Sequence, residues 1–434
     1  MAVLQEQARR YPDLDLTPLD TSGLEPRDAA LAHAIYDAVI RRWITLEHLI
    51  AASLDKSWEL APPRVKAAML AGAAQLVLLD RVPAHAAVHE SVEWVKGPLG
   101  PRAAGLVNAV LRRTAELAGE SERTHRPQWN DLPDEVPLSD GTAVVLTRGC
   151  MPADPLERLS VATSHPMELL RTLSRSMPMR DVRRIAMHNL LAPPVILNTL
   201  HAQSALPEGL IPHTAPGHHV YTGEYADLGP MLRSRKDIWV QDPASALAVQ
   251  TVADLKPALI IDPCAGMGTK TRQLAATFPQ ARIIATDIDL PRRHELERVF
   301  EGHERVEVVP FKSLREFVGQ ADLILLDVPC SNSGVLARRP EARYRFDEKR
   351  TESLESTQRQ IVADSIPLLR PGSGKGRILY STCSLDPREN EEMARWASRW
   401  HSLNAVREHR RLPEGVPGDP PERYSDGSFA VLLE

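Results

Sequence analysis

The chain has 434 residues, of which 43% are hydrophobic and 25% are charged, as in ordinary globular proteins. This length predicts about three domains. The first ten residues lack the apolar core of a signal peptide, and no apolar run approaches the roughly 18 residues that span a membrane. We therefore expect a cytoplasmic protein without a membrane partner. The net charge of −5 argues weakly against nucleic-acid binding, although local basic stretches matter more.

The four cysteines, Cys150, Cys264, Cys330 and Cys383, are too sparse and too widely spaced for a disulfide framework. We expect a reducing compartment to keep them as thiols. None belongs to a Cys-x-x-Cys or Cys-x-x-His pair, which would form half of a tetrahedral zinc site. The sequence therefore predicts no metal.

The first predicted domain, residues 1–125, is helical. Apolar residues recur at helical spacing in three stripes, which are Leu31, Ile35, Ala38 and Val39, then Val65, Ala68, Met69, Gly72, Leu76 and Leu79, then Leu106, Val107, Val110 and Leu111. Pro83, Pro98 and Pro101 punctuate the run. We expect a compact bundle. His85 and His89 within it lack a nearby third ligand, which favours a structural or surface role over metal binding.

Residues 126–160 are polar and proline-rich, which predicts a linker. Their one apolar burst, Ala143–Leu146, allows a short hairpin. Residues 161–235 form a predicted small α+β region, with a helix around 166–189 and a strand over Pro194–Asn198.

The last predicted domain, residues 236–434, has the regular alternation of a doubly wound, largely parallel sheet. The predicted strands are Ala258–Ile261, Arg282–Ala285, Val306–Val309, Leu323–Leu326 and Arg377–Tyr380, and the predicted helices cover 269–278, 291–301, 351–368 and 387–401. In such sheets ligands bind beyond the carboxyl ends of the strands. That rule places four segments in one site, namely Asp262–Lys270, Asp287, Asp327–Ser331 and Ser381–Ser384.

The first of these segments reads Asp-Pro-Cys-Ala-Gly-Met-Gly-Thr-Lys-Thr (262–271). Its glycines let the backbone approach a ligand closely, and the following helix presents free N–H groups. It is not a P-loop, because Thr269 precedes Lys270, and Thr271 stands where a dinucleotide fingerprint has its third glycine. Asp287 ends the next strand, where a carboxylate accepts hydrogen bonds from ribose hydroxyls. A nucleoside cofactor follows, but these residues leave open which one.

Two cysteines lie on loops that directly follow strands, in Asp-Val-Pro-Cys-Ser (327–331) and Ser-Thr-Cys-Ser (381–384). A thiolate adds readily to an electron-poor carbon and later leaves, which suits addition and elimination on a ring. Asp327 is placed to bind the Watson–Crick edge of a base. The run Asp386-Pro387-Arg388-Glu389 predicts a helix start, so Cys383 lies on a strand-to-helix turn. A lone free cysteine is more often a small buried hydrophobe, but two on adjacent ligand-facing loops favour function.

Two basic stretches are candidates for RNA contact. Residues 338–350 carry six basic and three acidic side chains, with Tyr344 and Phe346 placed to stack on bases. The second comprises Arg171, Arg175, Arg180, Arg183 and Arg184. Each is also compatible with a solvated helix face, and for the second the two interpretations stay open.

These motifs carry a family resemblance. Residues 262–271, the run Asp-Val-Pro-Cys-Ser-Asn-Ser-Gly-Val-Leu (327–336) with Arg339-Pro340, and Ser-Thr-Cys-Ser-Leu (381–385) with Glu389-Asn390-Glu391 resemble the RNA cytosine-5 methyltransferases of the Nol1/Nop2/Sun family. Residues 80–93 and 105–113 resemble the NusB-like domain of its bacterial Sun (Fmu, RsmB-type) branch, and Ser164-His165-Pro166 and Asn198 its middle RNA-binding region. The likeness spans most of residues 25–434.

The resemblance implies an all-α NusB-like bundle, a small α+β middle region and a C-terminal Rossmann-like domain that methylates a cytosine of 16S rRNA with S-adenosyl-L-methionine. It implies that Cys383 attacks C6 of the base and that Cys330 assists release. By the same likeness Lys270 and Asp327 contact the cytosine. The implied cofactor residues are Cys264, Ala265, Gly266, Met267, Gly268, Thr269, Lys270, Asp287 and Asp327, with Cys264 only packing. The expected partner is RNA, and the expected state is a monomer.

Three departures from the family pattern stand out. Gly-Met-Gly-Thr-Lys-Thr (266–271) replaces Ala-Pro-Gly-Gly-Lys-Thr, and Asn332-Ser333 replaces Gly-Thr, which affects loop geometry more than chemistry. Pro310–Ser313 lacks the aspartate that commonly contacts the adenine side of the cofactor.

Three alternatives remain. A nicotinamide-dependent oxidoreductase would use the glycine loop but neither cysteine. A non-catalytic NusB-like RNA-binding or antitermination factor would not need the thiols. A methyltransferase of this kind can also act on another RNA, such as tRNA.

Overall fold

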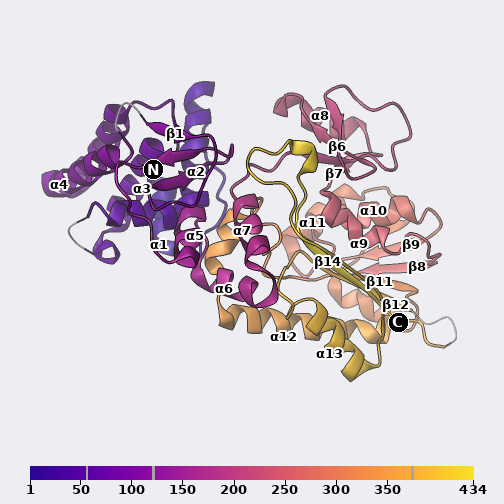
Figure 1. Cartoon of the computed structure of the whole chain (residues 1–434). Coiled ribbons are helices and arrows are strands. Elements are labelled where there is room, and N and C mark those ends of the chain that lie inside the picture. The colour runs from indigo at the N-terminus through magenta and orange to yellow at the C-terminus, as the bar shows by residue number, and fades with distance from the viewer. Residues whose placement is uncertain (55–56, 120–122, 373–375) are drawn as a thin grey trace. The chain divides into compact units, whose positions relative to one another are not determined.

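The computed structural model describes residues 1–54, 57–119, 123–372 and 376–434, and the chain divides into two compact units (Figure 1). The first unit comprises 1–192, 336–347 and 416–418, and the second comprises 193–335, 348–415 and 419–434. The predicted middle region, 161–235, is therefore split between the units. The part up to residue 192, with helices α6 (Met167–Ser176) and α7 (Met179–His188), belongs to the first, and the part from residue 193, with its strands and helix α8 (Tyr225–Ser234), belongs to the second.

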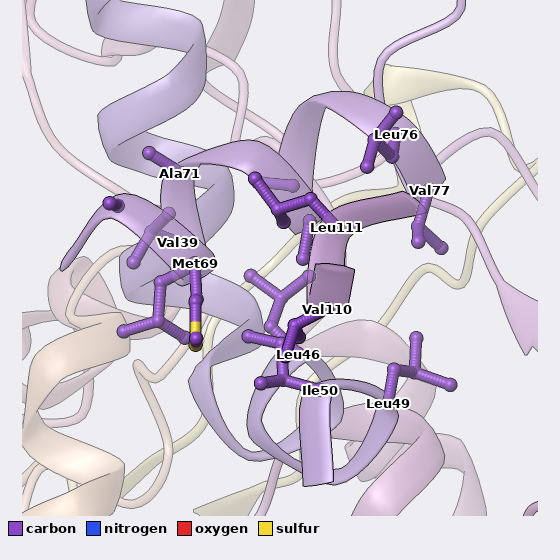
Figure 2. Close-up of a cluster of buried hydrophobic side chains, with 14 of the residues drawn as sticks. Val39, Leu46, Leu49, Ile50, Met69, Ala71, Leu76, Val77, Val110 and Leu111 are labelled. Atoms are coloured by element: carbon purple, nitrogen blue, oxygen red, sulfur yellow. The ribbon is translucent and has the colours of Figure 1, made fainter. Parts of the chain in front are cut away.

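The first unit is built around helices α2 (Pro26–Ala51), α3 (Pro63–Val77) and α4 (Ala84–Leu117). Helix α3 is buried along almost its whole length. Figure 2 shows Val39 and Leu46 of α2, Met69 and Leu76 of α3, and Leu111 of α4 in this core. Gly72 of α3 permits the close approach, since a Cβ there would lie 2.5 Å from a methyl group of Leu111. The predicted bundle is confirmed.

The range labelled α4 consists of two helical segments that meet at a kink at Gly100, between Pro98 and Pro101, where the prolines of the sequence predict a break. The interruption is local. Gly100 has a φ of +78°, a left-handed conformation that only glycine adopts without strain, and helical geometry resumes beyond it. Helix α1 (Ala2–Arg10) and the short helix η1 (Trp58–Leu60) complete this part.

Residues 126–160 are not the linker that the sequence predicts. Among the described residues, β1 (Thr124–Arg126), β3 (Ala143–Val145) and β2 (Glu135–Pro137) form an antiparallel sheet in that order, followed by helix α5 (Pro155–Thr163). Val136 and Val144 are fully buried in the core of the first unit. The apolar burst thus supplies a central strand, because both of its neighbours pair with it.

The single helix predicted around 166–189 is two helices, α6 (Met167–Ser176) and α7 (Met179–His188). Pro178 caps the second and cannot continue the first, since it has no N–H to donate. Four of the five arginines in this basic stretch are exposed, and Arg183 lies over the ring of Trp129 at 4.3 Å and pairs with Asp131 at 2.7 Å.

The segment 336–347, with the short helix η3 (Pro340–Arg345), folds into the first unit. The Tyr344 hydroxyl donates to the carbonyl of Ile40 at 2.8 Å and accepts the N–H of Trp43 at 3.2 Å. Arg343 is fully buried and donates to the carbonyls of Asn189 at 3.0 Å and Leu336 at 3.2 Å.

The expectation that Tyr344 and Phe346 stack on bases is therefore wrong. Both rings are buried, with 4% and 9% of their surface exposed. Arg343, one of the basic residues of this stretch, is buried because it donates hydrogen bonds to buried carbonyl groups. The spacing of residues in the sequence does not reveal such a contact.

The second unit begins with a small antiparallel sheet. Among the described residues its order is β5 (Leu210–Pro212), β6 (His218–Tyr221), β4 (Ile196–Asn198) and β7 (Trp239–Val240), with helix α8 (Tyr225–Ser234) beside it. Leu197, Leu228 and Ile238 form its core.

The main sheet of the second unit is doubly wound, as predicted. Within the described ranges its order is β10 (Val306–Val308), β9 (Arg282–Ala285), β8 (Leu259–Asp262), β11 (Leu323–Asp327), β12 (Arg377–Thr382), β14 (Ser428–Leu433) and β13 (Ala405–Arg411). The strands from β10 to β12 are parallel and match the predicted ones within two residues, whereas β13 and β14 run antiparallel and were not predicted.

Helices cover both faces of this sheet. Helices α9 (Pro243–Gln250), α10 (Thr269–Thr277) and α11 (Leu290–Val299) pack on one face through Ala248, Leu274 and Leu296. Helices α12 (Glu348–Ser365) and α13 (Glu391–His401) pack on the other through Val362 and Met393. The short helices η2 (Phe311–Phe317), η4 (Ile366–Leu368) and η5 (Pro421–Arg423) lie in connections.

Candidate active site

The carboxyl edge of four adjacent strands gathers the residues that the sequence selects. Strands β9, β8, β11 and β12 are neighbours in the sheet. The turn Cys264–Gly268 follows β8, Asp287 follows β9, Asp327 ends β11, and Cys383 follows β12. These four segments, which lie far apart in the sequence, therefore meet at one edge of the main sheet.

The glycine turn is held by the carboxylate of Asp287. Its Oδ2 accepts the N–H of Gly266 at 2.9 Å, and its Oδ1 accepts the N–H of Asp289 at 2.9 Å. Gly266 and Gly268 have φ values of +56° and +87°. A Cβ at Gly268 would lie 2.7 Å from the ring of Phe300, so the turn requires glycine there. The N-terminus of α10 opens directly after this turn, and its free N–H groups suit a polar ligand.

Lys270 and Asp327 form an ion pair beside the turn, with 2.7 Å between Nζ and Oδ2. Burial alone would lower the pKa of Lys270, but the charge and hydrogen bond of Asp327 raise it above the ordinary value. The Ser381 hydroxyl donates to the other oxygen of Asp327 at 2.9 Å. This arrangement keeps a fixed cation and an oriented carboxylate at the strand ends.

The two cysteines of the paired loops meet, with 3.2 Å between Sγ of Cys330 and Sγ of Cys383. The hydrogen bond to Cys383 and burial raise the pKa of Cys330. Asn332, in a left-handed conformation with φ +60°, accepts the Cys383 thiol at 3.4 Å and donates to the carbonyl of Cys330 at 3.0 Å. Asn332 thus contacts the Cys383 thiol directly, whereas the sequence predicts for it only an effect on loop geometry.

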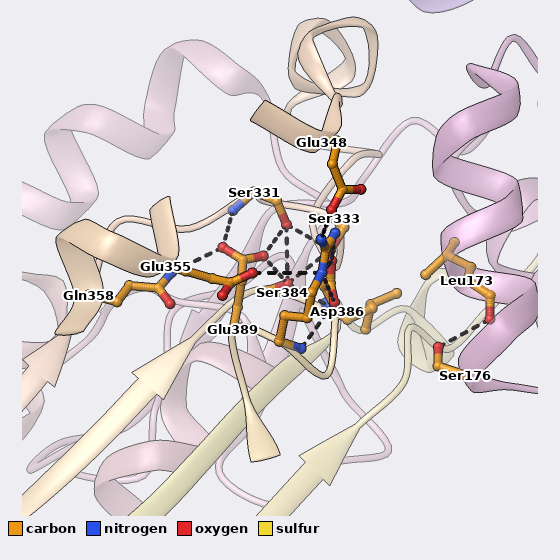
Figure 3. Close-up of polar contacts among 12 residues, drawn as sticks. Leu173, Ser176, Ser331, Ser333, Glu348, Glu355, Gln358, Ser384, Asp386 and Glu389 are labelled. Carbon is orange, nitrogen blue, oxygen red and sulfur yellow. Dashed lines mark hydrogen bonds and ion pairs between the residues drawn. The ribbon is translucent and has the colours of Figure 1, made fainter. Parts of the chain in front are cut away.

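The surroundings of Glu389 differ from those that the sequence predicts. The predicted helix start at Pro387 is wrong, because α13 begins at Glu391 with Asn390 as its N-cap. Glu389 instead turns into the protein and is fully buried. Its carboxylate accepts the N–H of Ser331 at 2.9 Å, the Ser331 hydroxyl at 2.5 Å, and the Ser384 hydroxyl (Figure 3).

Ser331 directly follows Cys330, and Ser384 directly follows Cys383. Glu389 therefore ties the two cysteine loops together one residue beyond each thiol. Gln358 of α12 extends the link, because its Nε2 donates both to Glu389 at 3.0 Å and to the carbonyl of Pro329 at 2.9 Å. Burial raises the pKa of Glu389, against the lowering effect of the serine hydrogen bonds.

A cavity of about 210 Å³ opens beside Cys383. Lys270, Ser381, Thr382 and Cys383 form its polar side, and the rest of its wall comes from α9, Val335 and residues 426–429. Its size suits one nucleobase, and the thiol and the ammonium face the same space.

Two cysteines take no part in this thiol pair. Cys150 belongs to the first unit, where burial raises the pKa of its thiol. Cys264 lies in the glycine turn, and burial also raises its pKa, which fits the expected packing role. Sequence reasoning missed the contacts of Glu389, Gln358 and Asn332. The one signal in the sequence was that a serine follows each cysteine, Ser331 after Cys330 and Ser384 after Cys383, because both serines donate to Glu389.

No helix among the described residues is long and apolar enough to cross a membrane. In the same part of the chain, no three histidine, cysteine or acidic side chains converge as metal ligands.

Comparisons with known proteins agree with this architecture. The family described as "16S rRNA methyltransferase RsmB/F" matches residues 249–413, and the NusB family matches residues 3–116. Ribosomal RNA small subunit methyltransferase B of Vibrio cholerae is 30% identical over 96% of this chain and 92% of its own length. The protein of that name from Xanthomonas campestris is 29% identical over 94% of this chain and 89% of its own.

Solved structures show the same fold. The crystal structure of PH0851 superposes with a TM-score of 0.70 at 20% identity, covering 95% of this chain and 91% of that one. NSun6 from Pyrococcus horikoshii, solved with SFG, has a TM-score of 0.50 at 17% identity and covers 62% of this chain and 98% of its own.

Fold and site together define a methyltransferase that carries an N-terminal NusB domain. The resemblance drawn from the sequence motifs is thereby confirmed. The chain belongs to the family of ribosomal RNA small subunit methyltransferase B.

Proposed function

We propose that this protein methylates C5 of a cytosine in 16S rRNA, with S-adenosyl-L-methionine as methyl donor and a transient bond between Cys383 and C6 of the base. The observation that carries the proposal is the pair of thiols 3.2 Å apart, next to the Lys270–Asp327 ion pair. The names of the curated relatives support small-subunit rRNA as substrate. A protein that modifies ribosomal RNA would be expected in the cytoplasm.

The glycine turn fits the proposed cofactor. Gly266 has open space where a side chain would project, and Asp287 holds the turn from the end of β9. We propose that Cys264, Ala265, Gly266, Met267, Gly268, Thr269, Lys270, Asp287 and Asp327 bind it. When bound, S-adenosyl-L-methionine supplies an electrophilic methyl group on a sulfonium.

The two thiols have different surroundings, which supports different roles. The hydrogen bond with Cys383 and burial raise the pKa of Cys330, so Cys330 keeps its proton and can donate it in that hydrogen bond. Cys383, in contrast, lines the cavity beside it together with Lys270, so its sulfur faces the space that would hold the base. Cys383 is then the attacking group and Cys330 the helper.

The proposed reaction balances at the base. Cys383 would add to C6, and the electron pair that this places at C5 would form the new bond to the methyl carbon as the methyl C–S bond of the sulfonium breaks and S-adenosylhomocysteine leaves. The C5 proton would then pass to solvent, its bonding electrons would re-form the C5–C6 double bond, and Cys383 would leave C6 with the electron pair of the C–S bond, with Cys330 assisting this release. Lys270 and Asp327 hold the ring, the ammonium toward its carbonyl oxygen and the carboxylate toward its amino edge.

Two cysteine variants test the mechanism on unmodified 16S rRNA transcript. Cys383→Ala is expected to abolish both methyl transfer and the covalent adduct. Cys330→Ala is expected to accumulate an RNA–protein adduct that survives denaturing gels, because addition proceeds and release does not. Cys150→Ala, in the first unit, is the matched control and should behave as wild type. Wild-type activity of Cys383→Ala would refute the mechanism.

Two measurements separate the alternative activities. Calorimetry with S-adenosylhomocysteine and with NADH distinguishes a methyltransferase from an oxidoreductase. Bisulfite mapping of rRNA and tRNA from cells that lack the gene identifies the modified cytosine. We also propose that the protein works as a monomer, since all proposed catalytic residues lie in one unit of one chain.

A further inference from the structure

A second hollow of the second unit lies among α8, β7, α10 and the end of α11, with a volume of about 1310 Å³. It adjoins a smaller hollow of about 160 Å³ that is lined by Met267, Gly268 and Thr269 of the glycine turn. The two share Leu232, Trp239 and Arg272 as lining residues. Together they form one groove, which we call the α8–α10 groove, and it reaches the turn proposed to hold the cofactor.

The α8–α10 groove carries an excess of positive charge. Its cationic lining residues are Arg233, Arg235, Lys236, Arg272, Arg298 and Arg305, and its acidic ones are Asp237, Glu301 and Glu304. Arg235 neutralises Asp237 through two hydrogen bonds of 2.7 and 2.9 Å, and Arg298 pairs with Glu295. Glu301 and Glu304 lie beyond the end of α11, away from the glycine turn in the sequence.

Three cations of the groove, one on α8, one just after α8 and one on α10, have no counter-charge in the described part of the chain. The side chains of Arg233, Lys236 and Arg272 have no hydrogen-bond or ion-pair partner within the described residues. Arg233 and Lys236 are exposed, whereas Arg272 is half-buried, and this burial lowers its pKa. A guanidinium partly removed from water without a counter-ion is unfavourable, so an anion in the groove would stabilise it.

The aromatic residues of the groove indicate which part of a nucleic acid it contacts. Trp239 and Phe300 are only 3% and 6% exposed, so their faces are not available for stacking by bases. The accessible groups are cations on long side chains, which contact phosphates without reading sequence. The ligand chemistry is therefore a row of phosphodiesters.

We propose that the α8–α10 groove binds the phosphates of the RNA strand that flanks the target cytosine, through Arg233, Lys236 and Arg272. This inference rests on the proposed function, because it takes the RNA of that reaction as the ligand. Gly268 and Thr269 line the near end of the groove and directly precede Lys270, which lines the cavity beside Cys383, so the groove starts next to the proposed place of the target base.

The test measures binding of wild type and variants to unmodified 16S rRNA transcript by filter retention at several KCl concentrations. The triple variant Arg233→Gln/Lys236→Gln/Arg272→Gln is expected to bind about tenfold more weakly near physiological salt. Each lost phosphate contact should also reduce the slope of log K against log salt by about 0.7, so that the triple variant loses about 2. Arg395→Gln, an exposed arginine of α13 on the other face of the sheet, is the matched control.

Calorimetry with S-adenosylhomocysteine accompanies each variant. A smaller salt slope with unchanged S-adenosylhomocysteine binding supports the groove. Wild-type affinity and slope in a triple variant that still methylates the RNA would overturn the groove and leave the proposed function intact. A wild-type protein that neither binds nor methylates 16S rRNA would refute the proposed function itself.

Discussion

Glu389 fixes the separation of the two thiols without touching either of them. Its carboxylate is an acceptor only, and its ligands are two hydroxyls, a backbone N–H and an amide N–H. An ionised carboxylate can accept all of these at once. A neutral side chain of the same shape cannot, because half of its end group donates.

Glu389→Gln is expected to lower the single-turnover rate of methylation by about tenfold to a hundredfold, since small displacements of reacting groups have effects of this size. The KM for S-adenosyl-L-methionine should stay near the wild-type value, because Glu389 does not touch the glycine turn. Rapid-quench assays with radiolabelled methyl donor measure both quantities. Glu392→Gln, exposed on α13, is the control, and an equal loss in both variants would argue against a positioning role for Glu389.

Asp262 at the end of β8 provides a test by pH. Burial raises the pKa of this carboxyl to about 7, and Thr271 donates to it at 2.7 Å. The unfolded chain has an ordinary aspartate that ionises near pH 4, so between about pH 4 and 7 the folded state binds the extra proton. Stability should therefore fall as pH rises through this window, by up to about 1.4 kcal/mol per pH unit from this group.

Asp262→Asn removes that titration. The melting temperature of the variant, relative to wild type, should rise from pH 4.5 to pH 7 and level off above it. Differential scanning calorimetry in buffers of matched ionic strength measures the difference. A constant difference across the range would show that Asp262 ionises normally in the folded protein.

At the scale of elements, the pattern of the sequence predicted the parallel part of the sheet and missed its antiparallel end. Strands such as Leu323–Asp327 are continuous apolar runs because helices cover both faces. Strand β13 reads Ala-Val-Arg-Glu-His-Arg-Arg and lies at the edge of the sheet, largely exposed, so neither apolar content nor alternation distinguishes it from a loop. It is a strand because it pairs with β14. A long connection separates the two strands in the sequence, so local patterns do not reveal the pairing.

The site shows the same division. Strand ends and the rule on sheet edges predicted where Lys270, Asp327 and Cys383 meet. The orientation of Glu389 was not predictable, because an Asp-Pro-x-Glu run is equally typical of a helix start, and only the buried serine hydroxyls draw the carboxylate inward. Local signals thus placed the strand ends, but neither the start of α13 nor the side chain of Glu389.

The segment 336–347 gives a prediction on the stability of the first unit. Tyr344→Ala removes a ring from the main core and leaves the Trp43 N–H and the Ile40 carbonyl unpaired, which should cost about 3–5 kcal/mol of unfolding free energy. Tyr344→Phe keeps the ring and should cost about 1–3 kcal/mol. Urea unfolding followed by tryptophan fluorescence measures both. Equal effects of the two variants would mean that the ring itself contributes little.

At the scale of the whole molecule, the two units are not consecutive pieces of chain. The assignment of 336–347 and 416–418 to the first unit means that the chain changes unit five times. A fragment of residues 1–192 therefore lacks Arg343 and Tyr344, and the carbonyls of Asn189 and Ile40 lose their donors.

We expect the fragment 1–192 to be digested by trypsin much faster than the same residues in the full chain. A synthetic peptide of residues 336–347 should restore part of the resistance, because it resupplies the buried ring and guanidinium. The same peptide with Tyr344→Ala and Arg343→Ala is the control. Full resistance of the fragment alone would show that the segment is dispensable for the first unit.

This interleaving also sets an order in time for the newly made protein. During synthesis the bundle leaves the ribosome first, yet its core lacks Tyr344 until residues 193–335 of the second unit have also been translated. At roughly 5–20 residues per second the wait is on the order of ten seconds. The nascent first unit must therefore stay soluble with an incomplete core, and it can finish folding only after the Cys330 loop has been made.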